Sequence, residues 1–240
     1  MRITFLGTGT AVQMSKAQSC ILIESDVRIL VDAGIGAFLR LDEAGISVNE
    51  LDAILLTHNH LDHNGDVLAI LKARWLENGE VLPIYGPRGT KEFFESLLEA
   101  YPYLRRKLRF KVLEDDSFAI GSLKISTIPT YHSIESRAYI IREGDKSIVV
   151  SGDTRAFREL MEIECNVLVH ELSLPFGFEA VDHTTPENLA EHIEFCRAER
   201  LYLTHLYPHA YRIKEDILKH LKNFSSIEIK VAEDMESFKI

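Results

Sequence analysis

The chain has 240 residues and a mass of 27.3 kDa; 46% of the residues are hydrophobic and 27% charged, so it can bury a core and is not expected to be disordered. Its 27 Lys and Arg against 37 Asp and Glu give a formal net charge of −10, which argues against broad non-specific binding to a polyanion. No apolar run approaches the roughly 18–20 residues that cross a bilayer, and the start MRITFLGTGTA lacks a secretory pattern, so we expect a cytoplasmic protein without a membrane partner.

The first half of the chain is predicted to combine short strands with helices. Strands are expected at residues 1–6, 19–24, 27–31, 53–57 and 81–85, the second and third forming a hairpin around Ser25-Asp26. Helices are expected at residues 35–44, 66–78 and 87–100, the first two ending at Gly45 and Gly79 and the third opening with Pro87.

The second half begins with repeated short strands and then becomes rich in helices. The short strands fill residues 109–150, and further strands are expected at 167–170 and 201–204. Helices are expected at 155–161, after Thr185-Pro186, and at 213–222. Two β-rich runs, each followed by helices, predict two packed sheets with helices outside. Because several strands are linked as hairpins, we expect mixed sheets in a single α/β domain spanning residues 1–240.

The cysteines give no sign of a disulfide framework or a thiolate zinc site. Cys20, Cys165 and Cys196 are scattered, odd in number and form no C-x-x-C pair. We expect them to be small buried hydrophobic residues.

The most informative segment is Thr57-His58-Asn59-His60-Leu61-Asp62-His63. It holds three histidines and an aspartate within six residues, directly after the buried strand at 53–57. We expect the strand end to place these side chains in a loop at the sheet edge, where they can converge. Imidazole and carboxylate suit zinc, manganese or iron, so the segment predicts a metal site.

Three further candidates each follow an apolar strand. His132 follows residues 128–131, Asp153 follows 148–152, and His205 follows 201–204. Any one of them alone is typical of a hydrogen-bonded core or loop residue. Together they repeat one device, a metal-ligand type at the carboxyl end of a strand.

This set of motifs resembles the metallo-β-lactamase superfamily over nearly the whole chain. Its H-x-H-x-D-H motif appears at residues 58–63, and its later ligands correspond to His132, Asp153 and His205. The resemblance implies a four-layer αββα sandwich with mixed sheets and a two-metal site at the sheet edges. It also implies that Asp32 supports the metal loop without binding metal.

The resemblance assigns the ligands residue by residue. One metal would be held by His58, His60 and His132, and the second by Asp62, His63 and His205, with Asp153 bridging the two. An aspartate at the bridging position is typical of the superfamily's phosphodiesterases and thioester hydrolases, whereas β-lactamases have cysteine there. The implied cofactors are two divalent ions, zinc first, with manganese or iron as alternatives.

Four segments resemble the ribonuclease Z branch of the superfamily. They are Phe5-Leu6-Gly7-Thr8-Gly9-Thr10, the run from His132 to Tyr139, His170-Glu171-Leu172-Ser173, and His183-Thr184-Thr185-Pro186. In that branch the histidine of the last segment gives a proton to the leaving oxygen and a nearby glutamate orients it. The resemblance therefore implies that His183 is a general acid oriented by Glu171, and that these two and Asp62 are the catalytic residues.

The chain departs from the long-armed ribonuclease Z proteins. Their flexible arm lies between the equivalents of His132 and Asp153, which are only 153 − 132 = 21 residues apart here. Since that arm grips tRNA, we expect weak binding to whole tRNA. The one basic cluster, Arg105-Arg106-Lys107 with Arg109, could contact phosphate, although a solvated loop is the favoured interpretation.

The favoured function is a metal-dependent phosphodiesterase acting on RNA 3′ ends or on small or cyclic phosphodiesters. The alternatives are a hydrolase of a thioester, lactone or other carboxylic derivative on the same scaffold, and a non-catalytic accessory protein. The expected partners are a phosphodiester substrate, RNA among the candidates, with a homodimer left open. Strand-end or surface roles are favoured for the remaining histidines in the second half: His170, His192, His209 and His220.

Overall fold

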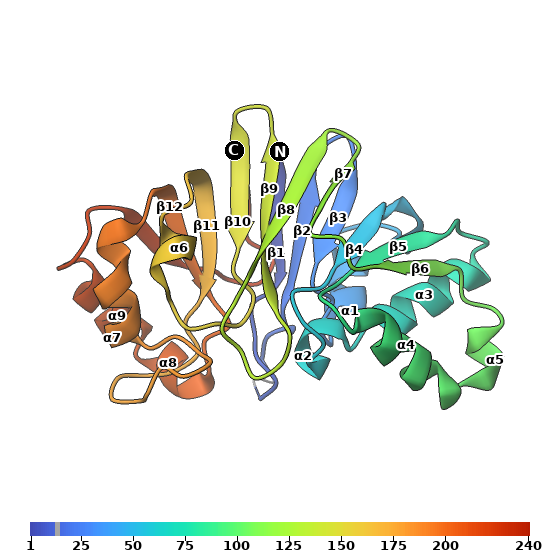
Figure 1. The fold of residues 1–240 in the computed structure, drawn as a ribbon, viewed down its shortest axis with the longest axis horizontal. Coiled ribbons are helices and arrows are strands. Elements are labelled where there is room, and N and C mark those ends of the chain that lie inside the picture. Colours follow the sequence, from blue (N-terminus) through green and yellow to red (C-terminus); the bar gives the residue numbers. More distant parts are fainter. Residues whose placement is uncertain (13–14) are drawn as a thin grey trace.

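Two seven-stranded sheets lie face to face in the computed structural model, which describes residues 1–12 and 15–240 (Figure 1). Helices of the first half of the chain cover one outer face, and helices of the second half cover the other. The predicted four-layer αββα arrangement is confirmed.

The first sheet joins an antiparallel half to a parallel half. Its strands β14, β1, β2 and β3 pair antiparallel, and β3, β4, β5 and β6 pair parallel. In spatial order they are β14 (Ser237–Lys239), β1 (Arg2–Gly7), β2 (Cys20–Glu24), β3 (Arg28–Val31), β4 (Ala53–Leu55), β5 (Leu82–Tyr85) and β6 (Phe110–Leu113).

The second sheet has the same mixed construction. Strands β7 to β10 pair antiparallel as a meander, and β10, β11, β12 and β13 pair parallel. In spatial order they are β13 (Glu228–Val231), β12 (Ala198–Thr204), β11 (Cys165–Glu171), β10 (Lys146–Val150), β9 (Arg137–Glu143), β8 (Leu123–Pro129) and β7 (Ser117–Ile120).

The helices are short and pack on the outer faces. Those connected with the first sheet are α1 (Ala37–Glu43), η1 (Val48–Glu50), α2 (Leu61–Asn64), α3 (Val67–Leu76), α4 (Thr90–Glu99) and α5 (Pro102–Arg105). Those connected with the second sheet are α6 (Arg158–Met161), α7 (Pro186–His192), η2 (Ile193–Phe195), α8 (Pro208–Arg212) and α9 (Lys214–Leu221). None of the helices in the described ranges combines the length and apolar character that crossing a membrane requires.

The strands are apolar on both faces because each sheet is buried on both sides. In β10, Ile148 and Val150 belong to the core between the sheets, whereas Val149 belongs to the core under the outer helices. Such a strand reads as a continuous apolar run instead of an alternating one. The hydroxyl of buried Tyr139 donates to the carbonyl oxygens of Leu56 (3.0 Å) and Tyr85 (3.2 Å), which ties β9 to the first sheet. This shared core supports the single domain, which remains a prediction.

Some predicted boundaries differ from the structure for local reasons. The helix expected from residue 87 begins at Thr90, because residues 87–89 form a turn in which Gly89 has a φ of 90°. The loop expected after the strand at 53–57 contains the one-turn helix α2, which carries Asp62 and His63. Strands β13 and β14 were not predicted; each has four residues or fewer and alternates polar with apolar side chains.

Candidate metal centre and its acid–base pair

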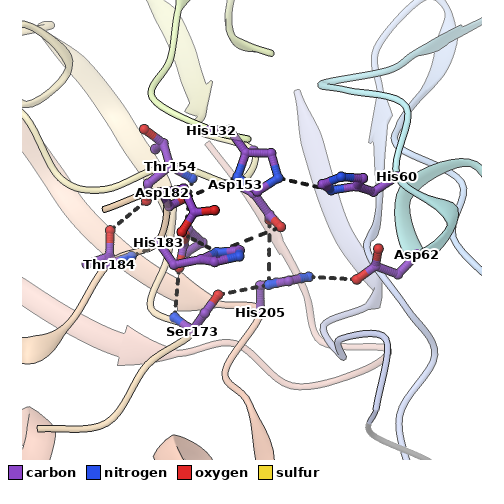
Figure 2. Close-up of polar contacts among 12 residues, drawn as sticks. His60, Asp62, His132, Asp153, Thr154, Ser173, Asp182, His183, Thr184 and His205 are labelled. Carbon is purple, nitrogen blue, oxygen red and sulfur yellow. Dashed lines mark hydrogen bonds and ion pairs between the residues drawn. The ribbon is translucent and has the colours of Figure 1, made fainter. Parts of the chain in front are cut away.

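All the predicted ligand residues lie together where strands of both sheets end. Figure 2 shows His60, Asp62, His132, Asp153 and His205 around one space. The first sheet contributes residues 58–63, which follow β4. The second sheet contributes residues that follow β8, β10 and β12. Gly152 has a φ of 61°, and a Cβ there would lie 2.6 Å from that of Thr57, so the two sheets approach closely at this edge.

Asp32 lies beneath the metal loop, as predicted. Its carboxylate accepts from the backbone N–H (2.8 Å) and the hydroxyl of Thr57, and it lies 2.7 Å from Nδ1 of His63. Because a carboxylate can only accept, Nδ1 of His63 must carry a proton, and a neutral His63 then presents the lone pair of Nε2 to the site. Asp32 itself adopts a φ of 60°, an uncommon value for a residue other than glycine.

The first ligand group consists of His58, His60 and His132. Nε2 of His58 lies 3.1 Å, and Nε2 of His132 lies 3.0 Å, from Nδ1 of His60. Tetrahedral zinc with Zn–N bonds of 2.0–2.1 Å separates its ligand nitrogens by about 3.3 Å. The three nitrogens thus lie close to the spacing of a metal site.

The outer hydrogen bonds show why these nitrogens need a cation. Nδ1 of His132 donates to the carbonyl oxygen of Asp182 (3.1 Å). The Thr57 hydroxyl gives its single proton to Asp32, so it must accept from Nδ1 of His58 (3.0 Å). With the proton on Nδ1, an uncharged imidazole at either position presents its lone pair at Nε2, and a bound metal ion is the partner that such convergent lone pairs fit.

The second group consists of Asp62, His63 and His205. Nε2 of His205 lies 3.3 Å from Nε2 of His63 and 3.3 Å from Oδ2 of Asp62. These separations again match the edge of a tetrahedron around zinc, about 3.3 Å. The three residues fit a second ion.

Asp153 lies between the two groups. Its Oδ1 is 3.3 Å from Nε2 of His63, and its Oδ2 is 3.9 Å from Nε2 of His58. The residue is buried, and Oδ1 has no hydrogen-bond partner among the described residues. A buried carboxylate oxygen without a donor is costly unless a cation binds it, so this atom fits a shared metal ligand.

The protonation of His58 and Asp153 agrees with metal binding. Burial, together with the charge of His63, lowers the pKa of His58 well below its ordinary value, which keeps this imidazole neutral. Burial alone would raise the pKa of Asp153, but His205 and His63 outweigh it and hold this pKa well below the usual range. Neutral imidazole and ionised carboxylate are the forms that bind metal. Burial lowers the pKa of His63, but the charges of Asp153 and Asp32 outweigh it and raise this pKa well above the ordinary value, so His63 must release a proton when it binds a metal.

His205 is positioned by the first loop of the chain as well as by its own strand. It has a φ of 56°, its N–H donates to the carbonyl oxygen of Thr8 (3.1 Å), and its Nδ1 lies 3.0 Å from Oγ of Ser173. The Asp234 carboxylate fixes that loop by accepting from the N–H and hydroxyl of Thr8 (both 2.9 Å), the N–H of Ala17 (2.8 Å) and Nη2 of Arg40 (3.1 Å). Ser173 and Asp234 were not predicted as site residues.

His183 and Glu171 form a pair beside the metal groups. Nδ1 of His183 donates to Oε1 of Glu171 at 2.9 Å and lies 4.0 Å from Oδ2 of Asp153. Glu171 is buried and also accepts from the N–H groups of Thr154 (3.1 Å), Ser173 (2.7 Å) and Thr184 (3.2 Å).

The pair favours a protonated histidine. Burial lowers the pKa of His183, but the hydrogen bond and charge of Glu171, followed by the charge of Asp153, raise it to about 9. His183 also lies close enough to His132 and Asp153 to form a third candidate ligand group. Its Nδ1 is already bound to Glu171, however, which leaves Nε2 as the nitrogen for a transferable proton.

The other histidines lie outside these groups. His170 is fully buried, with Nδ1 donating to the carbonyl oxygen of Glu171 and burial lowering its pKa. Nδ1 of His192 donates to the carbonyl oxygen of Asn188, and His220 packs against Phe176 and Phe224. The basic cluster begins at the end of α5, and its residues belong to none of the candidate ligand groups.

Comparison with known proteins gives one family and several relatives. The family described as anti-Pycsar protein Apyc1 matches residues 1–223. The ribonuclease Z of Methanopyrus kandleri is 28% identical over 244 residues, which cover 84% of this chain and 85% of that protein.

Two solved structures share the fold. The metallo-β-lactamase fold protein YhfI from Bacillus subtilis superposes with a TM-score of 0.84 and 22% identity, covering 99% of this chain and 98% of that one. The short form of human tRNase Z, ELAC1, superposes with a TM-score of 0.79 and 23% identity, covering 100% and 99%. The predicted metallo-β-lactamase fold is thereby confirmed.

Proposed function

The chain belongs to the family of the anti-Pycsar protein Apyc1 and is a ribonuclease Z-like member of the metallo-β-lactamase superfamily, and from this premise we propose that it is a two-metal phosphodiesterase for small or cyclic phosphodiesters. The observation that carries the proposal is the His183–Glu171 pair placed against two groups of metal-ligand side chains. The metal groups alone would suit several kinds of hydrolysis, whereas a partly buried histidine held by a buried carboxylate serves a leaving group that needs a proton.

The residues divide into two ion-binding sets and a bridge. We assign His58, His60 and His132 to one ion and Asp62, His63 and His205 to the other, with Asp153 shared. All seven are imidazole or carboxylate groups, five histidines and two aspartates, and none is a thiolate. This donor set fits zinc best, with manganese or iron as alternatives. Bound divalent ions supply an acidified water and neutralise charge on the phosphate.

The chain's own residues handle the leaving group. Hydrolysis breaks the bond between phosphorus and the leaving oxygen, and that oxygen must gain a proton to depart as an alcohol. His183 holds this proton on Nε2, because Nδ1 donates to Glu171. The Glu171 carboxylate, held by three backbone N–H groups, fixes the ring and stabilises its charged form.

The same pair argues against the thioester alternative. A thiolate leaves readily without a proton and would gain little from a histidine whose pKa is raised to about 9. An alkoxide leaves poorly, so its protonation by a placed acid contributes roughly 10²–10⁴-fold. The geometry thus favours a phosphodiester.

Small substrates are favoured over whole tRNA. The residues between His132 and Asp153 form β9 and β10 with a two-residue turn, so this interval has no room for a tRNA-gripping arm. The formal net charge of −10 also disfavours long polyanions.

The test is a substrate panel with metal-loaded protein. It contains nucleoside 2′,3′- and 3′,5′-cyclic phosphates, bis-p-nitrophenyl phosphate, precursor tRNA and an acyl thioester. We expect hydrolysis of the small phosphodiesters and none of the thioester. Faster turnover of the thioester than of every phosphodiester would reject the proposal, and preferred cleavage of precursor tRNA would replace its substrate class.

A further inference from the structure

A cavity of about 440 Å³ is lined by residues that neighbour His132, Asp153 and His183 in the sequence. Its walls come from the three segments that also carry His132, Asp153 and His183, and from α7. Tyr131 directly precedes His132, Arg155 lies two residues after Asp153, and Ala180 lies three residues before His183. The volume falls in the about 300–1,000 Å³ range typical of small-molecule sites.

Hydrogen bonds hold these segments in fixed relation. The N–H of Tyr131 donates to Oγ1 of Thr154 (3.0 Å), and the hydroxyl of Thr184 donates to the carbonyl oxygen of Thr154 (2.8 Å). Thr154 thus connects the cavity walls to one another. Its N–H also donates to Glu171, which connects the walls to the acid pair. The cavity is therefore part of the same rigid surroundings as the proton donor.

Flat, exposed groups line the cavity. The guanidinium of Arg155 stacks on the ring of Tyr131 at 4.3 Å, and Phe157 meets Tyr131 edge to face with ring centroids 5.1 Å apart. Tyr131 is 47% exposed and Phe178, which also lines the cavity, is 59% exposed. Aromatic rings and guanidinium planes at such a cavity are surfaces on which another planar ring can stack.

The charges of the cavity decide against a second phosphate. Glu187 and Glu191 face it together with Arg155, and Arg155 is already stacked on Tyr131. One engaged cation beside two carboxylates makes a poor site for an anion, whereas the carboxylates can accept hydrogen bonds from the amino groups of a heteroaromatic ring.

We propose that this cavity, the ring cavity, binds the nucleobase or equivalent aromatic ring of the alcohol that His183 protonates. The inference rests on the proposed phosphodiesterase function and assigns its substrate's ring to Tyr131, Arg155 and Phe178. Stacking there holds the leaving group on the side of the acid, so Tyr131 and Phe178 determine specificity without taking part in the chemistry.

The experiment compares substrates with and without a ring. The pair is a nucleoside cyclic phosphate that the panel shows to be cleaved and the matching methyl riboside cyclic phosphate. Tyr131→Ala should raise KM for the nucleoside substrate roughly 5- to 100-fold, the range for loss of one base–aromatic stack. It should leave KM for the methyl riboside unchanged, and Tyr131→Phe should behave like the unaltered protein.

Phe178→Ala should show the same selective effect. Matched controls are Tyr103→Ala on α5 and Phe224→Ala, since both rings have comparable exposure, 51% and 48%, and lie outside the ring cavity. Neither control should change KM. Equal losses on both substrates in Tyr131→Ala would assign Tyr131 to support of His132, and no loss on either would leave the cavity unused; both results overturn the proposal.

A binding measurement separates this inference from the proposed function. Calorimetry with metal-loaded protein compares a nucleoside 5′-monophosphate with ribose 5-phosphate. Tighter binding of the nucleotide that disappears in Tyr131→Ala and Phe178→Ala supports the ring cavity, even if no phosphodiester in the panel is cleaved. Hydrolysis of the panel with equal binding of the two ligands overturns the ring cavity while the phosphodiesterase stands.

Discussion

Replacement of Glu171 by glutamine tests the acid pair without removing the acid. The side chain keeps its size but loses its charge, and one of its oxygens becomes an N–H donor. Oε1 of Glu171 accepts from three donors and Oε2 accepts from the N–H of Ser173. The NH₂ group of glutamine would therefore face a donor in either orientation of the amide. The effect on His183 should therefore be both a loss of charge and a loosening of the ring.

The size of the effect follows from the pKa of His183. This pKa is raised from 6.5 to about 9 against the opposing effect of burial, and Glu171 makes the largest contribution that raises it. If it returned to 6.5, the difference of about 2.5 units would change the ratio of protonated to unprotonated histidine by roughly 300-fold. His183 is largely enclosed, with 15% of its side chain exposed, so solvent screens little of this difference.

The sign of the pH dependence is fixed by the raised pKa. A group with a raised pKa keeps its proton at low pH and loses it as the pH rises through that value. At a pH where His183 is protonated in both proteins, the change in its pKa should lower kcat of Glu171→Gln only slightly. As the pH rises, His183 loses its proton in the variant before it does so in the unaltered protein. The loss of kcat on an alkyl phosphodiester should therefore grow toward the roughly 300-fold limit.

The assay measures kcat on two substrates across pH in four proteins. The proteins are the unaltered chain, Glu171→Gln, His183→Ala and the double variant; the substrates are an alkyl phosphodiester and bis-p-nitrophenyl phosphate. His183→Ala should lose about 10²-fold or more on the alkyl substrate and far less on the phenolate substrate, with its metal retained. The double variant should lose no more than His183→Ala, because Glu171 acts through His183.

Two results would refute this reasoning. A loss in Glu171→Gln that is independent of pH and equal on both substrates would mean that Glu171 supports the fold of the 171–184 loop. Losses that multiply in the double variant would mean that the two residues act separately, and the general-acid role of His183 would then be abandoned.

The remaining predictions concern metal and RNA. Asp153→Ala should lose activity and bind fewer than the close to two metal ions per chain expected by elemental analysis of the unaltered protein; retained activity would contradict the bridging role. Removal of metal should lower Tm by about 5–10 °C at a free ion concentration near 100 Kd, since such binding stabilises by about 2.7 kcal/mol. Asp234→Asn should weaken the ion shared by Asp62, His63 and His205 while sparing the other, seen as two separated affinities in a metal titration. Binding of whole tRNA at physiological salt should be weak, and nanomolar affinity in a filter assay would show that another surface replaces the missing arm.

The sequence identified the candidate ligand residues because their residue types form local patterns. His58, His60, Asp62 and His63 fall within six consecutive positions, and His132, Asp153 and His205 follow apolar runs that form strands. Helix α2 was missed because four residues are too few to show a helical period. The edge strand β14 was missed for a related reason, since its three residues pair with β1 across more than 230 positions of sequence.

The supporting contacts could not be read from the sequence because they join distant positions. Asp234 accepts from Thr8 and Ala17, which lie 226 and 217 residues away in the sequence. The hydrogen bonds of Glu171 connect two loops and the end of β11, and the ring cavity exists only where three loops meet. Residue type identifies a possible ligand, but only the fold decides which carbonyl or carboxylate fixes its orientation.

Each candidate ligand group combines residues from both halves of the sandwich, so the proposed metal centre depends on the whole fold. His58 and His60 follow β4 of the first sheet and meet His132, which follows β8 of the second. Asp62 and His63 in α2 likewise meet His205, which follows β12. The core between the sheets therefore sets the separation of the ligand nitrogens and oxygens. The hydrogen bond from the Tyr139 hydroxyl to the carbonyl oxygen of Leu56 joins the two sheets one residue before Thr57. Since ions bind only where the sheets are correctly spaced, metal affinity reports the packing of the central core as well as the identity of the ligands.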